Sequence, residues 1–244
     1  MDEMMMGGFP AGSVTALAGP LGAGKTLAGI HFTMEGVRRN EKAMFAGFRE
    51  TPRQLIDKAS SFGMDLGKAA ADGRVLLFHH RAVDLVVDEV TEGIRAELER
   101  FGPARLVLDS YGDLALGMPE ERRRPYMAAF TSFLRSQEVT ALLAVETSQV
   151  PGPNPDFSNT PLALLAQNLL LLRHAEFRGG LYRIISILKM RDSAFDASIR
   201  ECMITPTGLM VRPASESAEG VLRGIDRLSY EPRGMRRAAE EPER

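Results

Sequence analysis

The octapeptide GPLGAGKT at residues 19–26 contains residue types that can bind the phosphates of a nucleotide. It matches the pattern G-x-x-x-x-G-K-[ST], in which glycines let backbone N–H groups converge on phosphate oxygens. Lys25 can neutralise the β- and γ-phosphates, and the hydroxyl of Thr26 can bind Mg²⁺. An apolar run precedes the octapeptide and an apolar-periodic segment follows it, so we expect the loop between a strand and a helix N-terminus. The predicted phosphate-binding residues are Gly19, Pro20, Leu21, Gly22, Ala23, Gly24, Lys25 and Thr26.

Two acids follow predicted strands, where a magnesium ion and an attacking water would need them. Asp109 ends the apolar run ARLVLD, and ligands of doubly wound sheets bind at the carboxyl ends of the strands. Asp109 and Thr26 are therefore the predicted magnesium ligands. Glu50 comes shortly after the run AMFAGF and is, with Lys25, the predicted catalytic residue. Each acid has a second interpretation, Asp109 as the cap of the next turn and Glu50 as a helix N-terminal acid stabilised by the helix dipole.

Strands and helices alternate along most of the chain, which indicates parallel strands joined by crossovers in a doubly wound α/β sheet. From residue 166 onward, strand follows strand, and we expect these to extend the sheet in antiparallel fashion. The predicted domain covers residues 1–212. The segment 213–244 is rich in Glu, Arg, Ser, Gly and Pro and is predicted to be a mostly disordered charged tail. The predicted helices lie at 25–39, 52–62, 84–101 and 122–137.

Composition restricts the classes of partner. The net charge of −2 over 244 residues argues against broad electrostatic binding to nucleic acid or to an anionic membrane. The most apolar segment, residues 162–172, is far shorter than the about 20 residues needed to span a bilayer. The single Cys202 cannot form an internal disulfide, which fits a reducing compartment. We therefore expect a cytoplasmic protein with no membrane or nucleic-acid partner.

Several runs together resemble the KaiC family of RecA-type P-loop ATPases, namely GGFPAGSVTALAGPLGAGKT, FRETPRQL, SFGMDL, RLVLDS and KMRDSAFDASIRECMIT. The resemblance extends from about residue 7 to residue 212 and is strongest to the second ATPase half of the family's circadian clock member. It implies a RecA-like fold, Mg-ATP as ligand, and a homo-oligomeric ring, usually a hexamer, with ATP at the subunit interfaces. It also implies that Lys189 and Arg191 contact the γ-phosphate of the neighbouring subunit. A pair of solvated charges on an edge strand is the alternative for these two residues.

The sequence departs from the family at two places. The family carries Glu-Glu after the second strand and uses the first acid as the base, whereas this chain has Arg49-Glu50. Because a guanidinium cannot accept a proton near pH 7, Glu50 must take over or hydrolysis is slow. The clock member phosphorylates itself on neighbouring Ser and Thr residues, but the equivalent positions here are Ala163 and Leu164. Autophosphorylation is therefore not expected.

Three functions fit these features. The leading hypothesis is an ATP-binding oligomeric switch with slow hydrolysis, acting in signalling or regulation with a protein partner that the sequence does not name. The second is a catalytically inactive nucleotide-binding scaffold, and the third is a DNA-directed RecA-like ATPase. The segment PGPNPDFSNTP at 151–161, where a related recombinase would contact DNA, has no Lys or Arg and argues against the third. Thr147 or Ser148, after Glu146 at a strand end, is a candidate γ-phosphate sensor.

Overall fold

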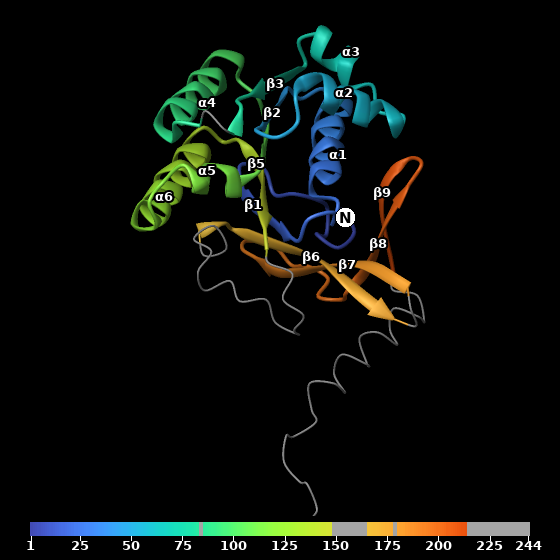
Figure 1. Cartoon of the computed structure of the whole chain (residues 1–244). Helices are drawn as coiled ribbons and strands as arrows, with labels where there is room; N and C mark the ends of the chain where they lie inside the picture. Colours follow the sequence, from blue (N-terminus) through green and yellow to red (C-terminus); the bar gives the residue numbers. More distant parts are fainter. Residues whose placement is uncertain (83–84, 148–164, 178–179, 214–244) are drawn as a thin grey trace, which may run out of the picture.

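A single mixed sheet organises the protein, as the computed structural model in Figure 1 shows. The structure describes residues 1–82, 85–147, 165–177 and 180–213. Within these residues, the sheet has nine strands in the order β3-β2-β4-β5-β1-β6-β7-β8-β9. The strands are β1 (Val14–Gly19), β2 (Ala43–Gly47), β3 (Val75–His79), β4 (Arg105–Asp109), β5 (Thr140–Glu146), β6 (Asn168–Phe177), β7 (Gly180–Met190), β8 (Arg200–Thr205) and β9 (Gly208–Pro213). The helices are α1 (Lys25–Arg38), α2 (Pro52–Ser61), α3 (Leu66–Ala71), α4 (Val87–Phe101), α5 (Tyr111–Leu116) and α6 (Glu120–Ser136).

The strand directions confirm the predicted fold class and add one detail to it. β1 to β5 pair in parallel, and β7, β8 and β9 pair in antiparallel fashion. The predicted antiparallel extension is confirmed, since β6 pairs in antiparallel fashion with β7, but the other side of β6 pairs in parallel with β1, which was not predicted. The leucines of β6 explain this position. Leu169 and Leu171 pack into one hydrophobic core and Leu170 and Leu172 into the other, as in a central strand covered on both faces.

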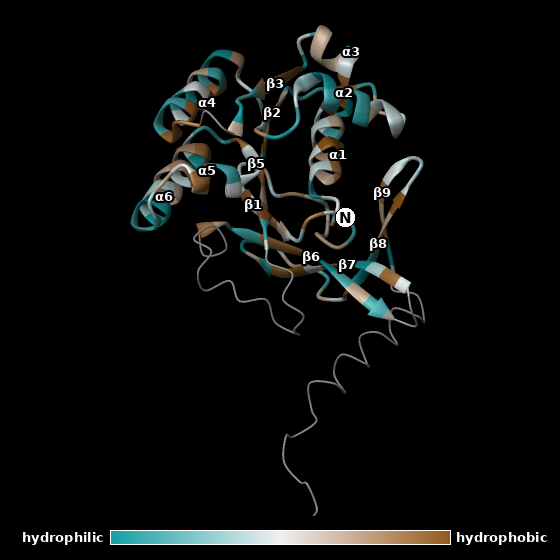
Figure 2. Ribbon diagram, in the orientation of Figure 1, coloured by the Kyte–Doolittle hydropathy of each residue, from teal (hydrophilic) through white to brown (hydrophobic). Residues whose placement is uncertain are grey.

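Helices cover the two faces of the parallel part of the sheet (Figure 1). One core contains buried residues of α4, α5 and α6, such as Ile94 and Leu114, packed on Leu106 and Leu108 of β4. The other contains buried residues of α1, α2 and α3 packed on Val107 of the same strand. Apolar residues therefore concentrate on the strands, and polar residues are frequent on α4 and α6 (Figure 2). This arrangement gives a sheet whose carboxyl edge is free to bind a ligand.

Helix boundaries follow local signals only partly. α2 begins as expected, with a capping box between Thr51 and Gln54 and with Pro52 in its first turn. α4 ends before Gly102, whose φ of 63° is left-handed, but it begins at Val87, three residues later than predicted. The helices α3 and α5 were not predicted from the sequence. Each has six residues, too few for a 3.6-residue periodicity to be visible.

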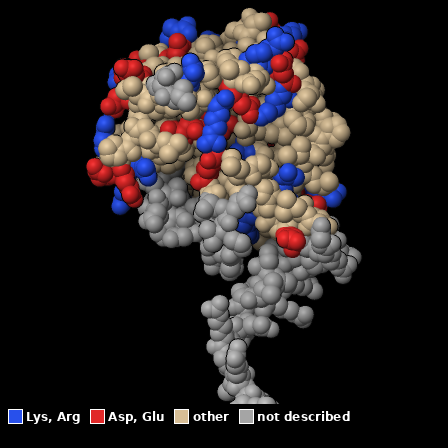
Figure 3. All heavy atoms as spheres, viewed as in Figure 1, with Lys and Arg blue, Asp and Glu red and all other residues tan. Residues whose placement is uncertain are grey.

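Some predictions concern residues that the structure does not describe. They are Ser148, the segment 151–161, the positions Ala163 and Leu164, and nearly all of the tail from residue 213, of which only Pro213 is placed, at the end of β9. These predictions stay predictions. None of the described helices is both long enough and apolar enough to cross a membrane. On the face that Figure 3 shows, Lys and Arg residues are interspersed with Asp and Glu residues.

Candidate nucleotide-binding site

A pocket of about 380 Å³ lies at the carboxyl edge of the parallel strands. The loop after β1, the residues that follow β2 and β4, and the last residue of β5 all contribute to it. Residues of α2 and of β8 also line it. The residues that line it are Leu21, Gly22, Gly24, Lys25, Thr26, Leu27, Phe45, Gly47, Arg49, Glu50, Leu55, Lys58, Phe62, Asp109, Ser110, Glu146 and Ile204. Five of the eight predicted phosphate residues therefore line the same pocket as the predicted metal ligands and Glu50, and Gly19, Pro20 and Ala23 do not line it.

The loop from Gly19 to Gly24 has the backbone that a phosphate site requires. Gly22 and Gly24 have φ values of 73° and 101°, in the left-handed region that glycine adopts without a Cβ clash. Gly24 is the N-cap residue of the 14-residue helix α1, and no side chain of the described residues caps this helix. The N–H groups of its first turn are thus left for an anion, which the helix dipole also favours.

Lys25 lies under this loop and is only 8% exposed. Its Nζ donates hydrogen bonds to the carbonyl oxygens of Gly19 and Pro20, both at 2.8 Å. Burial lowers the pKa of Lys25, whereas the carboxylates of Glu146 and then Asp109 raise it. An ammonium has three N–H donors, and the described contacts of Lys25 use two of them. The third can reach a phosphate without any loss of these bonds.

Thr26, in the first turn of α1, and Asp109, at the end of β4, lie side by side. The Thr26 hydroxyl donates to Oδ2 of Asp109 at 2.6 Å. Burial raises the pKa of Asp109, and the bond from Thr26 and the charge of Lys25 act against this rise. The described residues contain no cluster of three or more His, Cys, Asp or Glu side chains that could hold a metal alone. One carboxylate and one hydroxyl fit Mg²⁺, which keeps several waters and completes its shell with substrate phosphates. Thr26 and Asp109 would hold this ion, which would neutralise phosphate charge.

Glu50 lines the pocket but is already engaged. Its Oε1 forms an ion pair with Nζ of Lys58 on α2, and its Oε2 is buried without a hydrogen-bond partner in the described structure. The charge of Glu50 also contributes to the raised pKa of Asp109, after burial as the main cause. The capping box of α2 is made by Thr51 and Gln54, so Glu50 is not needed as a cap. A water or a cation could satisfy this unpaired oxygen.

Arg49 forms contacts that the sequence did not reveal. Its Nε donates to Oδ1 of Asp113 on α5 at 2.9 Å, and its Nη1 donates to Oε1 of Glu146 at 2.6 Å. Burial, the largest single cause, lowers the pKa of Arg49, but the hydrogen bonds to these two acids and their charges together raise it overall. The only sequence signal for this cluster is Glu146, an acid that ends a strand beside the P-loop strand.

Lys189 and Arg191 do not lie in the pocket of their own chain. Lys189 is the penultimate residue of β7 and donates from Nζ to the carbonyl oxygen of Ala166 at 2.6 Å, while Arg191 follows the strand. Met190 at this end of β7 pairs with Asn168 of β6, and Asn168 pairs in turn with Thr15 near the amino end of β1. The P-loop leaves the opposite end of β1, roughly 13 Å further along the strand. Any γ-phosphate that these cations reach is therefore bound to another molecule.

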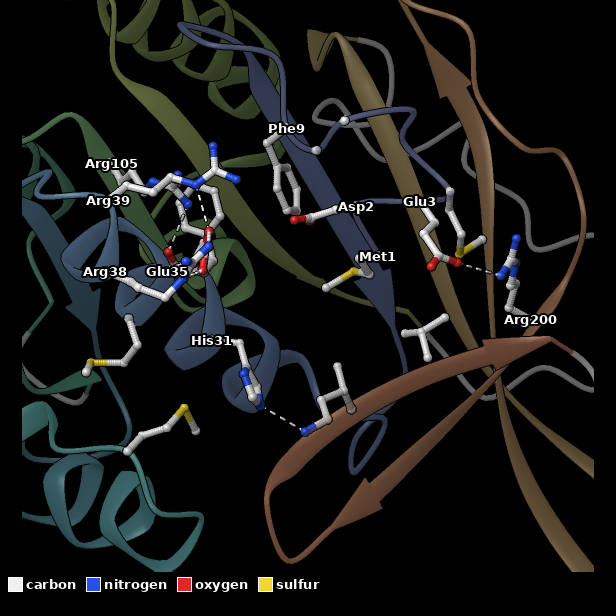
Figure 4. A pocket seen from close by; sticks show the side chains of 18 residues that line it. Met1, Asp2, Glu3, Phe9, His31, Glu35, Arg38, Arg39, Arg105 and Arg200 are labelled. Carbon is white, nitrogen blue, oxygen red and sulfur yellow. Dashed lines mark hydrogen bonds and ion pairs between the residues drawn. The ribbon is translucent and has the colours of Figure 1, made fainter.

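The hairpin of β8 and β9 covers the P-loop from the side. Ile204 lines the pocket, and a Cβ added to Gly24 would lie 3.2 Å from Cδ1 of Leu209. The backbone N–H of Leu209 donates to Nε2 of His31 on α1 at 2.9 Å (Figure 4). Burial lowers the pKa of His31 and so favours the neutral ring that accepts this bond. The hairpin is thereby fixed to the helix that carries the phosphate loop.

A second pocket, of about 560 Å³, lies between the N-terminal segment, α1 and β9 (Figure 4). Every arginine that lines it has an acidic partner. Arg38 and Arg39 both pair with Glu35, while Arg105 and Arg200 pair with acids outside α1. Although this pocket is larger, its arginines are already in ion pairs, and it lacks the glycine loop and the helix N-terminus of the nucleotide pocket.

A family model described as "ATPase: KaiC" matches residues 1–216. The chain belongs to the KaiC family of ATPases. The resemblance predicted from the motifs is therefore confirmed, and with it a RecA-like nucleotide-binding fold. The preference for the second half of the clock member stays a prediction.

Curated KaiC proteins resemble nearly the whole chain. It is 30% identical to "Circadian clock oscillator protein KaiC" of Thermosynechococcus vestitus over 224 residues. The identity is 29% to "Circadian clock oscillator protein KaiC 1" of Synechocystis and 28% to the KaiC protein of Synechococcus elongatus. In each case the match covers 92% of this chain and 43% of the relative. The chain therefore spans less than half the length of these relatives.

Proposed function

We propose that this KaiC-family protein binds Mg-ATP, assembles into a homo-oligomeric ring and acts as a slowly hydrolysing switch in signalling or regulation. The observation that carries the proposal is the pairing of Arg49 with two acids. It stands where the family has its catalytic acid, and its guanidinium is tied to Asp113 and Glu146. A side chain that cannot accept a proton is thus fixed beside the phosphate cradle.

Slow hydrolysis follows because Glu50 is the remaining candidate for the general base. A general base typically contributes about 10²–10⁴-fold to the rate. Glu50 is the candidate, but it must separate from Lys58 or work through its second oxygen. Lys25 serves the reaction by stabilising phosphate charge. Turnover should accordingly fall below the usual range of about 1–10³ s⁻¹.

Assembly follows from the position of Lys189 and Arg191. Both lie at the end of the sheet where the parallel strands begin, opposite the nucleotide pocket, so they can complete only a neighbour's site. A head-to-tail arrangement that repeats this contact closes into a ring when its rotation allows. We propose a hexamer from the family resemblance, and a cytoplasmic location from the free, buried Cys202.

The decisive experiment measures mass and phosphate release on the same sample. Light scattering should show a larger mass with Mg-ATP than with Mg-ADP or without nucleotide, because a ligand at the interface stabilises the oligomer. Replacing both Lys189 and Arg191 by Ala should remove this ATP effect. The matched control replaces Arg95 and Arg122, two exposed arginines on α4 and α6, by Ala and should keep it. An identical mass distribution under all three conditions would refute the ring.

The same sample separates the two other functions. A catalytically inactive scaffold would assemble with ATP but release no more phosphate than a Lys25→Ala variant. A DNA-directed ATPase would show phosphate release that rises with single-stranded DNA and falls with salt. We expect slow release above the Lys25→Ala background, and no response to DNA.

A further inference from the structure

Three elements converge on the guanidinium of Arg49. Besides its bonds to Asp113 and to Oε1 of Glu146, it donates from Nη2 to Oε2 of Glu146 at 3.2 Å. The Asp113 side chain is 3% exposed and also accepts a hydrogen bond from Oγ of Ser110 at 2.8 Å. The Arg49 side chain itself is 47% exposed and lines the pocket. The guanidinium is therefore anchored on one side and open to the pocket on the other.

This guanidinium lies at the phosphate end of the pocket. Glu146 is level with Gly19, the residue from which the P-loop leaves β1, and the N–H of Thr147 donates to the Gly19 carbonyl at 3.2 Å. Apart from burial, the charges that shift the pKa of Lys25 are those of Glu146, Asp109 and Arg49. Lys25, the residue that contacts the terminal phosphates in a P-loop, therefore lies close enough to interact electrostatically with Arg49 and Glu146.

The hydrogen-bond inventory leaves room for a ligand. A guanidinium has five N–H donors, and the bonds of Arg49 to described residues use three. One N–H remains on each Nη atom. Two donors in this planar arrangement match two oxygens of a phosphate, which is the geometry that arginine prefers for anions. A γ-phosphate also brings negative charge next to Glu146, and the guanidinium between them offsets part of that repulsion.

We propose that Arg49 is a γ-phosphate ligand supplied by the same subunit, through which the protein distinguishes ATP from ADP. This inference rests on the proposed Mg-ATP site. With ATP, the free Nη donors bind γ-phosphate oxygens while Nε stays on Asp113. With ADP, the guanidinium keeps its bonds to Asp113 and Glu146, and the two free Nη donors have no phosphate partner.

A purely structural Arg49 would behave differently. If it only neutralised Asp113 and Glu146, its loss would weaken the pocket for both nucleotides by the same factor. A γ-phosphate ligand must instead lower the affinity for the triphosphate alone. The ratio of the two dissociation constants is therefore the diagnostic quantity, and it does not require turnover.

The test is calorimetric titration of the full chain with Mg²⁺ and either ADP or a non-hydrolysable ATP analogue. Arg49→Gln should weaken binding of the triphosphate by about tenfold or more, which is the loss typical of hydrogen bonds to a charged group. The same variant should weaken binding of ADP by less than about threefold. Arg49→Lys keeps the charge but not the planar pair of donors and should lose part of the preference. The matched control is Arg53→Gln, an arginine four residues away that is 84% exposed and pairs with Asp57. It should leave both affinities unchanged.

Two further variants keep the outcome interpretable. If Arg49→Gln does not fold because Asp113 is left unpaired, combining it with Asp113→Asn removes both charges and should show the same loss of triphosphate preference. An unchanged ratio of dissociation constants in the folded Arg49 variants overturns the inference. Lys25→Ala should weaken the binding of both nucleotides. If it weakens neither, the proposed Mg-ATP site itself is wrong, whatever Arg49 does.

Discussion

Removing the ammonium of Lys25 is the sharpest test of the nucleotide site. Without nucleotide, Lys25→Ala has two opposite effects on stability. It removes the cost of burying a charge, but it leaves the carbonyls of Gly19 and Pro20 without their donor. We therefore expect the melting temperature of the nucleotide-free protein to change little.

With nucleotide, the effect is large and can be worked out. Each charge-assisted hydrogen bond to a phosphate contributes about 1.5–3 kcal/mol, so losing Lys25 should weaken Mg-ATP about ten- to a hundredfold. At an ATP concentration of 100 Kd, wild-type protein gains about 2.7 kcal/mol, and the variant at the same concentration gains about 1.4 to 0.4 kcal/mol. A domain of this size shifts about 2–4 °C per kcal/mol. The ATP-induced rise in Tm should fall from about 5–11 °C to at most about 6 °C.

The assay is thermal unfolding followed by circular dichroism, with and without Mg-ATP. Lys42→Ala serves as the matched control, because Lys42 is an exposed lysine that bonds to the Phe101 carbonyl away from the pocket. It should keep the full ATP-induced shift. If Lys25→Ala also keeps the full shift, the phosphate-binding role of the loop at 19–26 is refuted.

Two further predictions concern the metal and the hairpin. Asp109→Asn should weaken ATP in the presence of Mg²⁺ but not in its absence, as measured by titration with and without EDTA; equal effects would contradict the metal assignment. His31 has a pKa lowered by burial, so its neutral form stabilises the fold fully above its unfolded pKa of 6.5, and this stability is lost as pH falls below that value. Tm should thus fall from pH 7.5 to 5.5 more steeply in wild type than in His31→Gln, whose amide oxygen can still accept from Leu209; parallel curves would refute this.

Local patterns were enough to predict that the glycine loop, Lys25, Thr26 and Asp109 would lie together. The glycines, Lys25 and Thr26 follow one another directly, so their relative positions depend on a single strand-loop-helix unit. Asp109 was found because a strand buried on both faces is apolar throughout, and its first acid marks the carboxyl edge. The fold class followed from the same alternation of short apolar runs and longer helices.

The contacts around Arg49 could not be predicted in this way. Asp113 is 64 residues from Arg49 and Glu146 is 97 residues away, so no local spacing relates them. They meet because β2, β4 and β5 end at the same edge of the sheet. The parallel direction of β6 depends likewise on a partner strand that is remote in sequence. Sequence patterns identify which residues could do chemistry, whereas the sheet order decides which of them are neighbours.

That difference changes what substitution of Arg49 is expected to do. From the sequence alone, Arg49→Glu restores the family's acid and is predicted to raise hydrolysis about tenfold or more. In the structure, the same change sets a third carboxylate against Asp113 and Glu146 and removes their shared cation. Breaking a buried pair costs about 3–5 kcal/mol, and the half-exposed guanidinium places this case below that range. Arg49→Glu should therefore destabilise the protein and repel ATP. Combining it with Asp113→Asn and Glu146→Gln removes the repulsion, and phosphate release by this triple variant should exceed that of wild type. If the single Arg49→Glu variant is stable and hydrolyses ATP rapidly, the electrostatic role assigned to Arg49 is wrong.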